Sequence, residues 1–413
     1  MKIIVSHPNS NQFNRWALDG LMDKDMLHEF NTSVASFPGT FLDKLSNVKS
    51  FSEIKRRSFV SRLQPFTKCS PWLETGRIVS NKFGFQSLTK HETGIFSVDS
   101  VYKDIDTKTK SRLKHAKFTG AKGVYAYEDG ALNTFREAKK LGMICFYDLP
   151  IGYWKHARKL LKEEYSRSPE WVSTLTGLQD SAAKLLKKDE ELKLADKIFV
   201  ASTFTKNSLK DFDHILNNVE VIPYGFPIPT TDRKYSSLKN RKKIKLLFVG
   251  RLEQRKGIGD VVKVADALKD FVSLTIVGQK PTNDCEALNS ALTRHVWTPS
   301  MPHSKILELM KEHDVLLFPS LFEGFGMVIT EAMSQGTPVI TTERTAGPDL
   351  ITHGENGWLM KAGSTISLKN CVEEILENRD LISQVGKNAL ESAFDRPWKK
   401  YGDELAEAMR KHF

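Results

Sequence analysis

The sequence is poor in cysteine and has no long apolar run. The cysteines are four residues far apart, Cys69, Cys145, Cys285 and Cys371, and none belongs to a CxxC motif or a Cys/His cluster. This spacing argues against a disulfide framework and against a zinc site. No stretch approaches the roughly 18 apolar residues of a transmembrane helix. The opening residues MKIIVSHPNS lack the longer apolar core of a signal peptide, so we expect a cytoplasmic protein.

Other absences narrow the class of protein further. There is no low-complexity tract, and 40% apolar with 27% charged residues is an ordinary composition for a globular chain. No GxGxxG turn follows a strand, which argues against a dehydrogenase. We find no DxD motif that we would assign to a divalent metal, and we expect neither a metal nor a cofactor.

Positive charge is concentrated in the first half of the chain. Residues 1–240 carry 38 Lys and Arg against 27 Asp and Glu, whereas residues 241–413 carry 23 of each. This asymmetry suggests an anionic partner, namely a membrane surface, a phosphorylated acceptor or nucleic acid, although a soluble basic surface would also explain it. The stretch KRRSFVSRL at 55–63 mixes Arg with Phe and Val, so it suits either an anionic membrane or a solvated helix face.

Apolar strand patterns alternate with amphipathic helix patterns in the second half. Expected strands are 244–250, 272–278, 314–320 and 337–342, and expected helices are 256–270, 303–313, 326–336 and 366–378. The first half repeats the theme at 2–7, 123–150, 190–212 and 219–225, and a Pro-rich polar stretch separates the two halves. The pattern predicts an α/β chain of two doubly wound, Rossmann-like domains facing each other across a cleft. Ligands then bind beyond the carboxyl ends of the strands.

The segment EGFGMVITE, residues 323–331, follows one of the expected strands. Glu323 lies in the loop after the strand, and Gly324 and Gly326 remove side chains where the loop turns into a helix, so that a ligand could approach backbone N–H groups. The helix N-terminus suits a phosphate, and Glu331 could accept hydrogen bonds from a ribose diol. The alternative is that both glutamates simply favour the first turns of a helix.

Two more loops carry chemistry at the same edge. In LLFVGRLEQRKGI, Arg251 and Lys256 follow a strand and could neutralise a diphosphate leaving group. In TTERTAGPDL, Gly347 and Pro348 fix a turn before Asp349, which opens a short helix. Backbone amides of this loop could contribute to the phosphate site, or the loop could simply need a tight turn with Asp349 as a helix cap. Each signal alone is weak, because many such loops contain Arg, Lys and helix caps.

Together the segments FVGRLEQRKG, PSLFEGFGMVITEAMSQGTPVI and AGPDLITHGENGWL resemble retaining glycosyltransferases of family 4, or glycosyl transferases group 1, which have the GT-B fold. ADKIFVASTFTKNSL and VEVIPYG are similar to the end of that family's first domain, and the resemblance covers about 190–395. It implies an acceptor-binding domain at 1–230, a linker at 231–243, a nucleotide-sugar-binding domain at 244–395 and a terminal helix at 396–413 that returns to the first domain.

The resemblance also implies roles for the residues of the second half. Arg251, Lys256 and Glu323 would be catalytic: the two cations would stabilise the departing diphosphate, and Glu323 would hold donor-sugar hydroxyls while Glu331 holds the ribose. The donor site would comprise Gly250, Arg251, Lys256, Glu323, Gly324, Phe325, Gly326, Met327, Val328 and Glu331. Residues 296–303 would lie against an unassigned base. Transfer would follow a front-face route without a metal, the leaving phosphate oxygen taking the acceptor's proton.

The first half would supply the acceptor side, with His7, Asn11, Glu128, Asp129 and Asp148 as candidates because each follows an expected strand. Many family members have a His–Asp pair where this chain has Tyr147 and Asp148. A histidine role at that place is therefore in doubt. A structural role for His7 and a helix cap at Asp148 are the alternatives.

The expected function is transfer of a sugar from a nucleotide-diphosphate sugar to a hydroxyl of a glycan or lipid-linked acceptor, in cell-envelope, exopolysaccharide or lipopolysaccharide assembly. The expected partners include an anionic membrane surface, with the chain peripheral on its inner face, but no nucleic acid. A sugar-nucleotide epimerase or hydrolase of the same fold, and a non-catalytic nucleotide-sugar-binding protein, are the alternatives. The sequence does not predict the donor, the acceptor or the oligomeric state.

Overall fold

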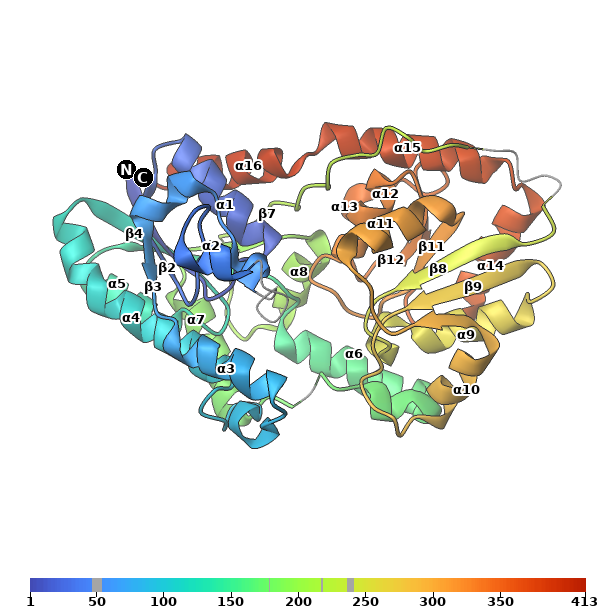
Figure 1. Cartoon of the computed structure of the whole chain (residues 1–413), viewed down its shortest axis with the longest axis horizontal. Coiled ribbons are helices and arrows are strands. Elements are labelled where there is room, and N and C mark those ends of the chain that lie inside the picture. The colour runs from blue at the N-terminus through green and yellow to red at the C-terminus, as the bar shows by residue number, and fades with distance from the viewer. Residues whose placement is uncertain (47–53, 178, 217, 236–240) are drawn as a thin grey trace.

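Two parallel β-sheets, one in each half of the chain, form the framework of the protein (Figure 1). The computed structural model describes all residues except 47–53, 178, 217 and 236–240. None of the helices among the described residues is both long and apolar enough to cross a membrane.

The first sheet has seven strands in the order β3-β2-β1-β4-β5-β6-β7, and every neighbouring pair is parallel. Its strands are β1 (Lys2–Ser6), β2 (Leu27–Thr32), β3 (Thr67–Cys69), β4 (Ala121–Tyr127), β5 (Ile144–Leu149), β6 (Lys197–Val200) and β7 (Val219–Val221). The strand order reverses between β1 and β4, which is where ligands bind in such sheets.

The second sheet has six parallel strands in the order β10-β9-β8-β11-β12-β13. Its strands are β8 (Ile244–Val249), β9 (Val272–Val277), β10 (Val296–Thr298), β11 (Val315–Phe318), β12 (Val339–Thr342) and β13 (Trp358–Met360). Here the order reverses between β8 and β11. Alternate residues of β8 enter two different cores, Leu246 and Phe248 on one face of the sheet and Leu247 and Val249 on the other. Burial on both faces explains the continuous apolar runs of the sequence.

Helices cover both faces of each sheet. Those of the first half are α1 (Gln12–Asp23), α2 (Phe41–Ser46), α3 (Trp72–Lys82), α4 (Val98–Phe118), α5 (Leu132–Lys140), α6 (Trp154–Arg167), α7 (Ala182–Leu194) and α8 (Thr203–Ser208), with 3₁₀ turns η2 (Ser61–Phe66), η3 (Gln86–Thr89), η4 (Pro169–Thr174) and η5 (Leu209–Asp211). Those of the second half are η6 (Gln254–Lys256), α9 (Ile258–Ala267), α10 (Glu286–Arg294), α11 (His303–Glu312), α12 (Met327–Ser334), α13 (Gly347–Leu350), α14 (Thr365–Glu377), α15 (Leu381–Asp395) and α16 (Trp398–Arg410).

The architecture confirms the predicted fold class of two doubly wound α/β units. The division at 1–230, 231–243 and 244–395 stays a prediction, and residues 236–240 of the expected linker lie outside the described residues. The sequence patterns did not predict the 21-residue helix α4, which begins at a Ser97 cap whose side chain accepts from the Ser100 N–H at 3.1 Å. They also missed α3 and α6.

A segment of the first half packs into the second. We call α6 and η4, residues 154–174, the α6–η4 bridge; in Figure 1 it runs along the lower edge of the molecule toward α10. Arg167 forms a two-pronged ion pair with Asp260 of α9 at 2.7 and 2.8 Å and another with Glu164 at 2.7 and 2.8 Å. The ring of Trp171 is buried in the apolar core of the second sheet, beside Leu252 and Ile258. The bridge therefore fixes the two halves to each other.

The terminal helix α16 returns to the first domain, as predicted. It packs along α1, and Trp398, Tyr401, Leu405 and Met409 join the core that contains strand residues of the first sheet (Figure 1). The two helices meet at glycines: a Cβ on Gly402 would overlap the carbonyl oxygen of Trp16, and a Cβ on Gly20 would overlap the carbonyl of Gly402. Backbone atoms of both helices occupy the space, so no side chain can move aside to make room.

We therefore expect Gly402→Val to destabilise the protein, because α16 must move away from α1 to make room. Overpacking of this kind costs about 1–3 kcal/mol and sometimes more. Urea unfolding, followed by tryptophan fluorescence, measures the effect. Gly177→Val is the matched control, since a Cβ at the exposed Gly177 would meet only the side chain of Leu161, at an ordinary 3.6 Å, and its φ is not positive. A smaller loss of stability for Gly402→Val than for the control would contradict the packing account.

Candidate functional site

The carboxyl ends of β8 and β11 lie side by side at the point where the strand order of the second sheet reverses. The loop after β8 runs through Gly250 to η6, and the loop after β11 runs from Pro319 to Gly326. Loops that follow neighbouring parallel strands lie at the same edge of the sheet. Lys256 and Glu323 therefore meet there, although they are 67 residues apart in sequence.

A buried ion cluster occupies this edge. The ammonium of Lys256 pairs with Oε1 of Glu323, and the same oxygen accepts from Arg255 at 2.7 Å and from the hydroxyl of Ser320 at 3.0 Å. Lys256 also lies 5.1 Å from the ring centre of Phe318 at the end of β11. Arg255 also lies 3.6 Å from the buried Glu253, so Glu253 and Glu323 balance Arg255 and Lys256. Arg251, which pairs with Glu253, adds an excess of one positive charge at this edge.

Burial and charge act against each other on these groups. Burial alone would raise the pKa of Glu323, but Lys256 and Arg255 outweigh it and hold that pKa below its ordinary value. Burial likewise lowers the pKa of Lys256, and Glu323 only partly offsets this effect. A buried cation that lacks full compensation favours an incoming anion, because the anion restores the charge balance that burial disturbs.

Arg251 extends outward from the same loop. Its Nε pairs with Oε1 of the buried Glu253 at 2.7 Å, while most of its side chain is exposed to solvent. Glu253 also accepts from the hydroxyl of Thr176 at 2.9 Å, just beyond the α6–η4 bridge. A Cβ on Gly250 would meet open space, so the start of the loop stays accessible. Arg251 can therefore turn toward a ligand while Glu253 keeps the loop in place.

The glycines of EGFG are packed against protein atoms, contrary to the expectation that they clear space for a ligand. A Cβ on Gly324 would overlap the carbonyl oxygen of Pro150 in the first domain, and the Gly324 carbonyl accepts from Ser202 at 2.6 Å and Thr205 at 2.9 Å. Gly326 has a φ of +91°, and its Cβ position lies 2.8 Å from the Phe318 ring. Gly324 thus permits the close approach of the two domains.

The remaining donor-side candidates border this contact. The buried ring of Phe325 packs on Tyr224 of the first half at 4.9 Å, whereas Met327 and Val328 are half-buried in the first turn of α12. Glu331 pairs with Nε2 of His303 at 3.0 Å, and this hydrogen bond raises the pKa of His303. The segment 296–303 therefore does lie near Glu331, although its first three residues form strand β10 rather than a loop.

Asp349 contacts the other domain instead of a helix of its own. Its carboxylate accepts from the backbone N–H of Thr203 at 2.9 Å and from the hydroxyl of the same residue. Asp349 therefore holds the first turn of α8 in the first half. This contact and the Gly324 contacts describe a closed arrangement of the two domains.

Three acceptor-side candidates have structural partners. Burial lowers the pKa of His7 to about 4, so its ring is neutral near pH 7; the ring lies 4.4 Å from that of Tyr127. Asn11 caps α1, its side chain accepting from the N–H of Asn14 at 3.1 Å. Asp148 is buried, accepts from the hydroxyl of Tyr125 at 2.5 Å, and has its pKa raised by burial to about 7. Their acceptor roles stay predictions.

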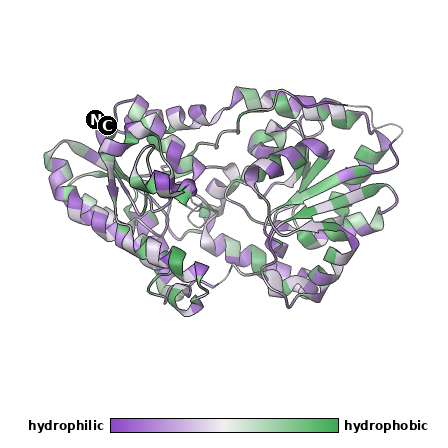
Figure 2. Ribbon diagram, viewed as in Figure 1, coloured by the Kyte–Doolittle hydropathy of each residue, from purple (hydrophilic) through white to green (hydrophobic). Residues whose placement is uncertain are grey.

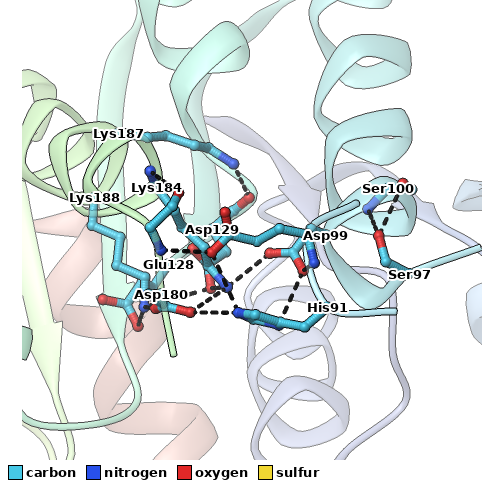
Figure 3. Close-up of polar contacts among 12 residues, drawn as sticks. His91, Ser97, Asp99, Ser100, Glu128, Asp129, Asp180, Lys184, Lys187 and Lys188 are labelled. Atoms are coloured by element: carbon cyan, nitrogen blue, oxygen red, sulfur yellow. Dashed lines mark hydrogen bonds and ion pairs between the residues drawn. The ribbon is translucent and has the colours of Figure 1, made fainter. Parts of the chain in front are cut away.

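Glu128 and Asp129, by contrast, belong to a charged cluster at the end of β4 (Figure 3). Lys188 of α7 lies 3.4 Å from Glu128, 3.7 Å from Asp129 and 3.1 Å from Asp180. Burial opposes the ionisation of Asp180, but Lys188 and Lys184 outweigh it and lower the pKa of Asp180 to about 2. Burial raises the pKa of Glu128 to about 7, against the opposing effect of Lys188.

The backbone at this cluster is strained. Asp129 has a φ of +70°, in the left-handed region that side chains rarely adopt. The buried carboxylate of Glu191 accepts the backbone N–H groups of Asp129, Ala131 and Leu132 at 2.9 to 3.1 Å and so holds the turn. Such strain persists only where surrounding contacts enforce it, and it is common at binding sites.

A cavity of about 100 Å³ joins the charged cluster to the second domain. It is lined by Glu128, Ile151, Gly152, Trp154, Ala157, Arg158, Gly177, Asp180, Leu185, Lys188 and Phe322. Phe322 directly precedes Glu323, so one wall of the cavity adjoins the buried ion cluster of the second sheet. The cavity thus brings Glu128 together with Phe322 of the second domain.

Among the described residues, His91, Glu92 and Asp180 are close enough for their ligand atoms to share a metal ion. Lys184 already lies 3.1 Å from Asp180, and the Ser181 N–H donates to Glu92 at 2.8 Å. These groups are therefore satisfied by protein partners.

The structure adds Arg255, His303, Asp180, Lys184 and Lys188 to the residues found by sequence. Arg255 adjoins Lys256 in the same motif and could have been included. The lysines of α7 and Asp180 gave no signal, because only the packing of α7 against α5 brings them to the end of β4.

The chain is similar to known proteins in sequence and in fold. Residues 230–392 match the family described as glycosyl transferases group 1. The N-acetyl-alpha-D-glucosaminyl L-malate synthase of Bacillus anthracis is 27% identical over 192 residues, which is 45% of this chain and 50% of that protein. The capsular polysaccharide biosynthesis glycosyltransferase CapM of Staphylococcus aureus is 26% identical over 170 residues, 38% of this chain and 43% of that one.

A solved structure of Anabaena Alr3699/HepE in complex with UDP is similar over 100% of both chains, with a TM-score of 0.63 and 16% sequence identity. Such a likeness shows the fold. The chain spans about half the length of the curated relatives that it matches first. Residues 230–392 match the model of the glycosyl transferases group 1, and the chain as a whole has the GT-B fold.

Proposed function

We propose that the protein is a retaining glycosyltransferase of family 4 that moves a sugar from a nucleotide-diphosphate sugar to a hydroxyl of a glycan or lipid-linked acceptor. The observation that carries the proposal is the buried cluster of Lys256, Arg255 and Glu323 at the strand-order reversal, inside the segment that matches the family. Arg251 adds one excess positive charge beside this cluster, where a GT-B fold would hold a donor diphosphate.

The chemistry follows from these charges. Arg251, Arg255 and Lys256 would neutralise the diphosphate as negative charge develops on its leaving oxygen, so the mechanism assigns no step to a metal. Glu323 would exchange part of its contact with Lys256 for hydroxyls of the donor sugar, while Glu331 holds the ribose. In a front-face transfer the leaving phosphate oxygen accepts the proton of the acceptor hydroxyl, and retention of configuration results.

The acceptor would enter the cavity between the two domains. Glu128, Asp180 and Lys188 offer both hydrogen-bond acceptors and donors there, which suits hydroxyl groups of a sugar. Asp129 would shape this wall through its backbone turn. The relative named for capsular polysaccharide biosynthesis supports a role in cell-envelope or exopolysaccharide assembly. We place the protein in the cytoplasm for this role.

Nucleotide binding tests the proposal. We expect one of UDP, GDP and ADP to raise the melting temperature of the wild type without added metal, and Glu331→Ala to abolish that increase because the ribose contact is lost. UDP is the first probe, since the Anabaena neighbour was solved with it. A differential scanning fluorimetry titration, with and without magnesium, makes the measurement.

Glu308→Ala is the matched control for that experiment, because Glu308 is an exposed carboxylate on the neighbouring helix α11, where it pairs with Lys305. It should respond to the nucleotide like the wild type. A wild type that responds to none of the three nucleotides would rule out the donor site.

A further inference from the structure

An apolar surface covers the segment between β3 and α4. Seven of the twenty exposed large apolar side chains among the described residues fall within residues 72–98, a small share of the chain. We call this set the apolar tip; it comprises Trp72, Val79, Phe83, Phe85, Leu88, Ile95 and Val98. Exposed apolar side chains gathered in one place mark an interaction site, whereas single ones do not.

The apolar tip is built by α3 and the turns after it. Trp72, Val79 and Phe83 are spaced by seven and four residues, so they share one face of α3 up to its C-cap. Trp72 is 84% exposed, and the rings of Phe83 and Phe85 stack at 6.3 Å. Figure 2 shows hydrophobic ribbon at α3, on the lower edge of the first domain.

The rest of the tip belongs to the same packed unit. The backbone N–H of Phe96 donates to the carbonyl of Leu88 at 2.8 Å, and the ring of Phe96 lies against Gly76 of α3. Ile95 and Val98 flank Phe96 in sequence and are exposed. The seven side chains thus share one rigid support.

The exposed charged side chains of the first part of the apolar tip are lysines, whereas Glu92 and Asp99 near its end are half-buried beside His91 and Lys184. Within residues 68–90, all of which are described, the exposed charged side chains are Lys68, Lys82 and Lys90. The one carboxylate of this segment, Glu74, is buried between Arg57 and Arg77. Large apolar groups with flanking lysines suit a bilayer that contains anionic lipid, since the chains bury the apolar groups and the headgroups attract the lysines.

The basic stretch at 55–63, where the sequence suggested membrane contact, is less suitable. The side chains of Phe59 and Leu63 lie in the core of the first domain, and Arg62 pairs with Asp19 and Asp23 of α1. Of its three apolar side chains only Val60 is exposed, so the stretch offers little apolar surface for insertion. The apolar tip in residues 72–98 is therefore the better candidate for membrane contact.

The apolar tip adjoins the acceptor side of the cavity. His91, just after Lys90, pairs with Asp180 at 2.9 Å, and Glu92 accepts from the N–H of Ser181 at 2.8 Å. Asp180 lines the cavity together with Glu128 and Lys188. A molecule held at the tip by its apolar part would therefore present its polar end near this cavity.

We propose that the apolar tip docks the protein on an anionic lipid bilayer. The bilayer would bury Trp72, Phe83 and Phe85, and Lys82 and Lys90 would meet its headgroups. As a consequence that rests on the proposed function, the acceptor is a lipid-linked glycan, whose headgroup enters the cavity while its lipid stays in the bilayer.

Vesicle flotation tests the docking. Wild-type protein should float with vesicles of phosphatidylglycerol and phosphatidylcholine, and less with phosphatidylcholine alone. Trp72→Ser/Phe83→Ser/Phe85→Ser should lose flotation with both. Because these side chains are exposed, the variant should keep its fold. Ile215→Ser/Ile228→Ser/Phe271→Ser, which removes three exposed apolar side chains elsewhere, is the matched control and should float like the wild type.

Absence of wild-type flotation, or equal flotation of the tip variant, would overturn the proposal. A wild-type dimer in light scattering that the tip variant abolishes, without vesicle binding, would assign the surface to a second copy and also overturn it. Flotation is measured without nucleotide, and the thermal response to nucleotide is measured on the same variants. If flotation fails, the nucleotide response can still support the donor site, and if the nucleotide response fails, flotation can still support docking. The two proposals are therefore tested separately.

Discussion

Replacement of Lys256 by Met should lower kcat by about 100- to 1,000-fold, the usual loss when one preorganised group that stabilises developing charge is removed. The ammonium group of Lys256 is buried beside Glu323. Water therefore cannot take over its role unless the surrounding residues move. The variant should still fold, because Arg255 and Ser320 keep Glu323 paired. The measurement is the initial rate of sugar transfer or donor hydrolysis, with the donor identified by the nucleotide screen.

Lys369→Met is the matched control for this variant, since Lys369 is a half-exposed lysine of α14 that pairs with Glu373. Its kcat should equal that of the wild type. A Lys256→Met protein that turns over the donor as fast as the control would show that this cation does not act on the leaving group. A loss of melting temperature without a loss of kcat would give Lys256 a structural role only.

Replacement of Arg167 by Met should be the most destabilising change outside the ion cluster. It leaves Glu164 and Asp260 buried without the cation that joins them, at 4% and 2% exposure of their side chains. Removal of one partner from a buried pair costs about 3–5 kcal/mol, and the partial exposure of Arg167 favours the lower end. Urea unfolding measures the shift, read at the first transition because two domains need not unfold together.

Arg294→Met, which removes an exposed Arg–Asp pair with Asp266, should change stability little and is the matched control. The double variant Arg167→Met/Asp260→Asn should recover part of the loss, since it no longer buries an unpaired charge. If the two losses simply add in the double variant, Arg167 does not neutralise Asp260. Nucleotide affinity of the single variant also reports on the bridge, because Gln254 of η6 donates to Glu164 at 2.8 Å.

The meeting of the candidate donor-side residues at one edge of the sheet was predictable from sequence, because it depends on short segments that follow strands. Arg251, Lys256 and Glu323 each follow an apolar strand within a few residues, and parallel strands bring such positions to one edge. The pairing of Lys256 with Glu323 follows once β8 and β11 are neighbours. The contact between Gly324 and Pro150 could not be foreseen, since nothing near a glycine in sequence reveals which distant backbone will occupy its missing side chain.

The first half was harder to interpret for a physical reason. Its chemistry depends on helices whose order in space is set by packing, such as α7, which places Lys188 beside Glu128 and Asp180. The sequence patterns predicted no helix at the α6–η4 bridge, and nothing in them indicated that Trp171 is buried in the second core. The apolar tip has no regular alternation beyond α3, so composition alone did not separate it from a core segment.

The return of α16 has a consequence for the order in which the protein forms during synthesis. Lys399 of α16 pairs with Asp23 of α1, a sequence separation of 376 residues, and the core around Ile3 and Val5 is closed by Tyr401 and Leu405. At roughly 5–20 residues per second, the ribosome would deliver α16 some tens of seconds after α1. During that interval the second domain can complete its core while the first waits with one apolar face uncovered. The half of the chain that is made first is therefore the half that finishes folding last.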